Sequence, residues 1–71
     1  MAIRKLEYTN SQIRELIRER IHSRRDRRIL FLKLVDGLTF GEIAEETGIP
    51  ISTITDAYYK QTKILFQDFP G

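Results

Sequence analysis

Hydrophobic residues recur along the chain with the spacing of one face of an α-helix. The first such series is Ile13, Leu16, Ile17 and Ile21. Spacings of three and four residues predict an amphipathic helix over residues 11–22, with Arg and Glu alternating on its outer face. Residues 9–11, Thr-Asn-Ser, are of the types that cap a helix N-terminus, so the helix is expected to begin there.

A second helix is predicted over residues 24–36. Ser23 can cap it, and Asp26 in its first turn opposes the positive end of the helix dipole. Residues 29–35 are apolar nearly all round, which is typical of the most central helix of a small bundle. Gly37 is expected to end this helix because glycine adopts the left-handed conformation at little cost.

A short third helix is predicted over residues 40–47. Thr39 and Glu42 have the spacing of a capping box, in which each side chain satisfies the other residue's backbone amide. Gly48 is expected to stop the helix, and Pro50 prevents its continuation because proline disfavours the helical conformation in the residue before it.

A fourth helix is predicted over residues 51–66, with Ser52 and Thr53 acting first as its caps. The residues expected on the inner face of this helix are Ile54, Ala57, Tyr58, Gln61 and Leu65. Tyr59, one residue further round the helix, is expected to be exposed.

These elements predict an all-α fold, a small four-helix domain in which residues 1–71 form one unit. The second half has the parts of a helix-turn-helix: a short capped helix, a tight glycine turn and a longer helix with a polar outer face. In a DNA-binding helix-turn-helix the first helix crosses the backbone and the second enters the major groove, where hydrogen-bonding side chains read the base edges.

Composition excludes several kinds of site. The chain has no cysteine and one histidine, His22, so we expect no metal centre, no cofactor and no catalytic residues. Glu45 and Glu46 are adjacent in sequence and therefore point to different sides of a helix instead of forming a paired acid. The N-terminus has no apolar run of signal-peptide length and no segment is apolar enough for a membrane span, so a cytoplasmic protein without membrane contact is expected.

Charge is divided unevenly along the chain. Residues 1–30 contain nine Lys and Arg against four Asp and Glu, whereas residues 31–71 contain three against six. The basic half is therefore not the half that carries the helix-turn-helix. Because affinity for DNA grows with the number of phosphates neutralised, the second half alone is expected to bind DNA weakly.

Residues 36–49, DGLTFGEIAEETGI, followed by Ser52-Thr53-Ile54, resemble the helix-turn-helix in the fourth conserved region of bacterial sigma factors. They also resemble the small sigma-like regulators of Gram-positive phages and prophages, a likeness that extends upstream through residues 8–13 and 21–27. The resemblance implies a domain that reads promoter-type DNA and can dock on RNA polymerase.

The resemblance also implies which residues contact double-stranded DNA. Thr39 and Phe40 would approach a phosphate at the start of their helix. Phosphate contacts from the side would come from Arg24, Arg25, Arg27 and Arg28. The residues that would face the major groove are Ser52, Thr53, Thr55, Asp56, Tyr59, Lys60 and Lys63.

Two positions depart from the family pattern. Where relatives usually carry Lys or Arg, this chain has Thr55 and Asp56. A carboxylate is repelled by phosphate but can accept a hydrogen bond from a cytosine amino group, so Asp56 is compatible with a specific base contact. Two interpretations of the arginine cluster at residues 24–28 stay open. It supplies the positive charge that residues 31–71 lack for binding phosphates, or it is a solvated helix start.

Two hypotheses of function follow. The first is a DNA-binding transcriptional regulator, which would need a homodimer or a second DNA-bound partner because one motif reads about one half-site. The alternative is a phage-type adaptor or inhibitor that uses the same fold to contact RNA polymerase or another host nucleic-acid enzyme. The acidic balance of residues 31–71 and Asp56 favour this alternative.

Overall fold

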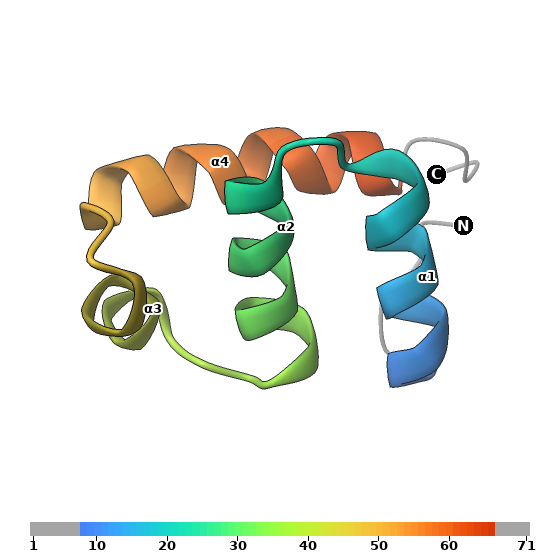
Figure 1. Cartoon of the computed structure of the whole chain (residues 1–71), viewed down its shortest axis with the longest axis horizontal. Coiled ribbons are helices and arrows are strands. Elements are labelled where there is room, and N and C mark those ends of the chain that lie inside the picture. The colour runs from blue at the N-terminus through green and yellow to red at the C-terminus, as the bar shows by residue number, and fades with distance from the viewer. Residues whose placement is uncertain (1–7, 67–71) are drawn as a thin grey trace.

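The computed structural model describes residues 8–66, which form the four-helix, all-α fold predicted from the sequence (Figure 1). The long helix α4 runs along one edge of the molecule, and α1, α2 and α3 follow one another along its length. The elements are α1 (Asn10–Arg20), α2 (Arg24–Leu30), a π-helical continuation η2 (Phe31–Val35), α3 (Phe40–Thr47) and α4 (Ile51–Leu65). That residues 1–71 form a single domain stays a prediction.

Residues 1–7 and 67–71 lie outside the described residues, and with them the prediction that the N-terminus holds no targeting segment. None of the helices in residues 8–66 is long and apolar enough to cross a membrane.

Helix α1 begins in a capping box and ends earlier than predicted. The Thr9 amide donates to Gln12 Oε1 at 2.9 Å, and the Gln12 amide donates to Thr9 Oγ1 at 3.1 Å. At the other end Ile21 is extended, with φ −106° and ψ 118°, so the predicted end at residue 22 is wrong by two residues. Arg27 explains this end, because its guanidinium donates to the carbonyl oxygens of Ile21 and Arg18.

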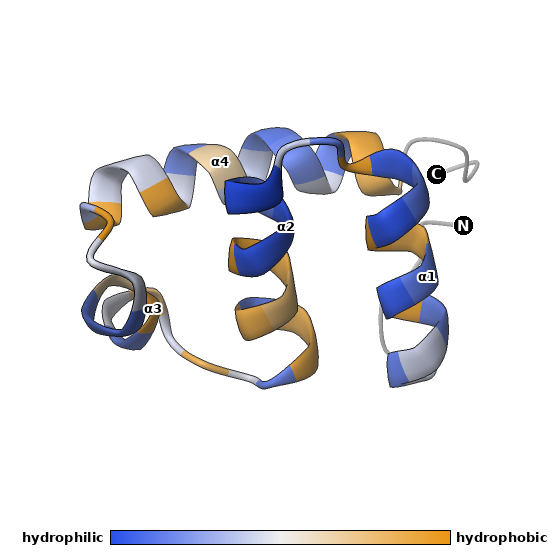
Figure 2. Cartoon of the chain, in the orientation of Figure 1, coloured by the Kyte–Doolittle hydropathy of each residue, from blue (hydrophilic) through white to orange (hydrophobic). Residues whose placement is uncertain are grey.

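The second predicted helix changes its winding midway. It is α-helical to Leu30 and π-helical from Phe31 to Val35, closing with a bond from the Asp36 amide to the Phe31 carbonyl at 3.1 Å. Gly37 follows with φ +77°, the left-handed conformation expected of it. Figure 2 shows that the N-terminal turn of α2 is hydrophilic and that η2, which continues it, is mostly hydrophobic.

The core consists of two clusters that share α2 and α4. The first joins α1 to them and contains Ile13, Ile17, Ile21, Leu30 and Leu65. The second joins α3 to them and contains Ile29, Ile43, Ile54 and Ala57. Helix α2 therefore supplies neighbouring residues to both clusters, and the α3–α4 pair is held in place by the second cluster.

Candidate nucleic-acid interface

Helix α3 begins in the predicted capping box. The Thr39 amide donates to Glu42 Oε1 at 2.8 Å and the Glu42 amide donates to Thr39 Oγ1 at 3.1 Å. The Glu42 carboxylate therefore already occupies the positive end of this helix, where the sequence placed a phosphate beside Thr39. This arrangement makes the start of α3 a poor phosphate site, although it fixes the helix firmly.

A short, tightly bonded turn joins α3 to α4. Gly48 has φ +76° and its amide donates to the Ala44 carbonyl at 2.9 Å. The Thr47 hydroxyl donates to the Ile43 carbonyl at 2.7 Å and accepts from the Ile49 amide at 3.2 Å. The chain therefore turns between two steeply crossed helices (Figure 1), and several polar groups of the turn are satisfied locally.

We expect Gly48→Ala to lower the free energy of unfolding by about 1–2 kcal/mol, because an L side chain is disfavoured in the left-handed conformation. A Cβ at this position meets no atom within 4 Å, so the cost comes from the backbone angle alone. Urea unfolding of the variant measures it. Gly41→Ala is the matched control, since Gly41 lies inside α3 without a positive φ. Equal or greater stability of Gly48→Ala would contradict this account of the turn.

Helix α4 begins without a side-chain cap. Its N-cap is Pro50, whose carbonyl accepts from the Ile54 amide at 3.1 Å, and no side chain completes the cap. The prediction that Ser52 and Thr53 serve as caps is therefore wrong. Both residues lie within the first turn, where the Ser52 side chain is exposed and the Thr53 side chain is half-buried.

The exposed side chains of α4 form one continuous face. Residues spaced by three, four and seven positions share a side of a helix, and Ser52, Asp56, Tyr59 and Lys63 are related in this way. All four are exposed, and Lys60 is exposed beside them. We call these five residues the α4 face. Thr53 and Thr55 are half-buried at its margins, and the Thr55 hydroxyl donates to the Ser52 carbonyl at 3.0 Å.

Aromatic rings connect the α4 face to the start of α3. Phe40 contacts Tyr58 and Tyr59, with ring centroids 5.3 and 6.2 Å apart. The Lys33 ammonium lies 4.6 Å from the centroid of Phe40, a cation–π distance. Burial, and secondarily the neighbouring Tyr59, raises the pKa of the Tyr58 phenol above its ordinary value. Tyr59 itself is 59% exposed, as predicted, so its ring is both anchored and accessible.

The charge on the exposed surface of α3 and α4 is mixed. Lys60 and Lys63 are its cations, and Asp56 forms no ion pair within residues 8–66. On α3 the side chains of Glu45 and Glu46 are exposed as well. The helix-turn-helix therefore offers duplex DNA two positive charges against several negative ones.

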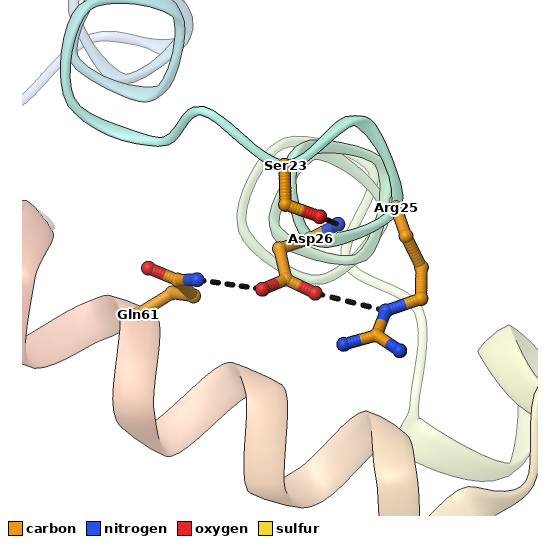
Figure 3. A network of polar contacts seen from close by, with 4 residues as sticks. All are labelled: Ser23, Arg25, Asp26 and Gln61. Carbon is orange, nitrogen blue, oxygen red and sulfur yellow. Dashed lines mark hydrogen bonds and ion pairs between the residues drawn. The ribbon is translucent and has the colours of Figure 1, made fainter.

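Asp26 forms a buried junction between α2 and α4 (Figure 3). It is 5% exposed, and one carboxylate oxygen accepts from Gln61 Nε2 of α4 at 2.6 Å. The other oxygen accepts from Arg25 Nε at 3.0 Å, and the Asp26 amide donates to the Ser23 hydroxyl at 3.3 Å. The sequence predicted a dipole interaction for Asp26 but gave no sign of its burial or of the bond to Gln61.

The four clustered arginines have different surroundings. Arg27 is half-buried and holds the end of α1. Arg25 leaves α2 on the side of α4 and is bonded to Asp26, with 53% of its side chain exposed (Figure 3). Arg24 and Arg28 are exposed one turn apart on the other side of α2. The cluster therefore does not act as one block of charge.

No group of His, Cys, Asp and Glu in the described part of the chain could hold a metal ion. The exposed side chains around α4 instead offer hydrogen-bonding groups, two ammonium groups and one aromatic ring on a rigid helix.

Comparison with known proteins identifies the motif. A family model described as Sigma-70, region 4 matches residues 23–59, which run from the cap of α2 to Tyr59 in α4. No curated protein and no solved structure was found to match the chain.

Proposed function

The chain belongs to the sigma-70 region 4 family, and from that premise we propose that it regulates transcription by placing the α4 face in the major groove of DNA. Domains of this family are helix-turn-helix units that bind promoter DNA in transcription and act by binding instead of catalysis. The observation that carries the proposal is the α4 face itself, a row of exposed polar residues along one side of a helix that the second core cluster and the α3–α4 turn hold in place.

The α4 face divides by chemistry into two kinds of contact. Ser52 and Asp56 lie toward the start of the helix and offer hydrogen bonds to base edges, with Thr53 and Thr55 at the margins. Lys60 and Lys63 lie toward its end and would contact phosphates, which fix register without reading sequence. Tyr59, between the two pairs, would pack against a sugar or a base.

Arg25 is the arginine that we assign to a phosphate. It lies on the side of α2 that faces α4, and its side chain remains about half exposed beside its bond to Asp26. We assign no phosphate to Thr39, because the Glu42 carboxylate shares its helix start. Three cations then support the complex, which predicts weak binding by one copy and a need for a homodimer or a DNA-bound partner such as RNA polymerase.

Asp56 provides a test of the assignment. We expect Asp56→Ala to lose a base preference worth about 1–3 kcal/mol at one base pair, because the carboxylate accepts from a cytosine or adenine amino group. Non-specific affinity should rise at the same time, since a charge repelled by phosphate is removed. Selection from a random duplex pool, followed by sequencing, measures both effects.

Glu19→Ala is the matched control, because Glu19 is an exposed acid on α1. It should leave the selected motif unchanged. If Asp56→Ala selects the same motif as the wild-type chain, Asp56 does not take part in base recognition. That outcome would leave the proposal of DNA binding itself standing.

A second candidate function is favoured by the negative charge of the same half. The exposed Glu45, Glu46 and Asp56 would suit a basic surface of RNA polymerase or another nucleic-acid enzyme, contacted in place of DNA. Failure of the wild-type chain to retain any duplex at low salt would favour this adaptor function. An origin in a phage or prophage stays a prediction of the sequence resemblance.

A further inference from the structure

The outer surface of α2 carries a shallow depression with arginines around an apolar base. It is lined by Arg24, Arg25, Arg27, Arg28, Phe31 and Leu32. Phe31 packs against the first core cluster and Leu32 against the second, so the base is held by both halves of the core. We call this surface the arginine depression.

Apart from Arg25, the rim of the arginine depression points away from the α4 face. On α2 the residues turned inward are Asp26, which bonds to Gln61, and Leu30, which packs with Leu65. At about 100° per residue, Arg24 and Arg28 lie on the opposite side of the helix. On α4 the exposed face likewise lies opposite Gln61. The body of a molecule about 20 Å thick therefore separates a duplex held by the α4 face from Arg24 and Arg28.

Positive charge in the depression is only partly neutralised by the described residues. Arg24 and Arg28 have no ion-pair partner among residues 8–66. Arg25 has one, the buried Asp26, and Arg27 is committed to carbonyl oxygens of α1. Two guanidinium groups at the rim are thus available to an external anion, one turn apart.

We propose that the arginine depression binds an acidic segment of a partner protein in which a hydrophobic side chain stands next to two carboxylates. The carboxylates would take the planar forks of Arg24 and Arg28, a geometry that guanidinium groups bind in a bidentate manner. The hydrophobic side chain would cover Phe31 and Leu32. Phosphate backbone offers nothing apolar for this base, which is why a peptide fits the surface better than nucleic acid.

The consequence is a two-sided adaptor that holds a partner protein on α2 and DNA on α4 at the same time. The two contacts meet only at Arg25, which lines the depression on the side of α2 that faces α4, while the peptide is held by Arg24 and Arg28 on the other side. The inference concerns α2 alone, so it can hold or fail whether or not the α4 face binds DNA.

The test is selection of 12-residue random peptides displayed on particles against the immobilised full chain. Enriched peptides should carry two or more Asp or Glu residues beside Leu, Ile or Phe. A labelled synthetic copy of the leading peptide should bind Arg24→Ala/Arg28→Ala at least about tenfold more weakly than wild type, since each lost charge-assisted bond weakens a small interface strongly. An amide copy with Asn and Gln for the acids should lose affinity equally.

Arg14→Ala/Arg18→Ala is the matched control, because these exposed arginines have the same spacing on α1. It should bind the peptide as wild type does, and circular dichroism should show both double variants equally helical. The proposal is overturned if no acidic peptide is enriched, or if the leading peptide binds Arg24→Ala/Arg28→Ala as tightly as wild type. A larger loss of duplex DNA affinity in that variant than in the control would also overturn it, by showing a phosphate-binding surface.

Discussion

Asp26→Ala is expected to lower the free energy of unfolding by about 2–3 kcal/mol. The substitution removes a charged acceptor that is 5% exposed and leaves the Gln61 amide and the Arg25 guanidinium without the carboxylate that bonds them. A domain of this size is stabilised by only about 4–10 kcal/mol, so the loss is a large share of the total. Urea unfolding followed by circular dichroism at neutral pH gives the value.

Asp26→Asn separates the buried hydrogen bond from the charge. The amide oxygen of Asn can still accept from Gln61, so this variant should retain more stability than Asp26→Ala. A double-mutant cycle with Gln61→Ala should show coupling between the two positions, because their side chains are in direct contact at 2.6 Å. An Asp26→Ala variant within about 0.5 kcal/mol of wild type would show that the junction contributes little.

Lys60→Ala/Lys63→Ala should weaken binding to duplex DNA by about tenfold or more at moderate salt, on every sequence alike. Each lysine that neutralises a phosphate adds about 0.9 to the slope of log K against log salt, so the double variant should lose about 1.8 of that slope. Fluorescence anisotropy with a labelled duplex across a salt series measures both quantities. Both residues are exposed, so stability should change little.

Arg14→Ala/Arg18→Ala again serves as the control, because it removes the same charge from α1. If both double variants lose the same slope, the effect reflects net charge and not contact through the α4 face. An unchanged slope in Lys60→Ala/Lys63→Ala would take the two lysines out of the complex.

Local features of the fold were predictable from the sequence because they depend on residues a few positions apart. The capping box at Thr39 and Glu42, the left-handed Gly48 and the burial of Ile54, Ala57 and Leu65 all follow from such patterns. The face of α4 that remains exposed follows from the same periodicity, so most of the candidate site could be located before its surroundings were known.

The features that the sequence did not reveal depend on contacts between distant residues. Asp26 and Gln61 are 35 positions apart, and Arg20 donates to the Leu65 carbonyl 45 positions away. The sequence alone does not distinguish the contacts of the four clustered arginines. Their contacts depend on how α1 and α4 pack against α2. Arg27, for example, donates to two carbonyl oxygens at the end of α1. The uncapped start of α4 was missed because Ser52 follows Pro50 at a spacing that suits a cap.

The central claim, that DNA is contacted through the α4 face, is tested most directly by nuclear magnetic resonance of the ¹⁵N-labelled chain titrated with the best-retained duplex from a random pool. The account predicts that amide signals of Ser52, Asp56, Tyr59 and Lys63 shift most, while those of Arg24 and Arg28 on the outer surface of α2 stay in place. Shifts concentrated on α2 with an unperturbed α4, or no shifts at low salt, would contradict it.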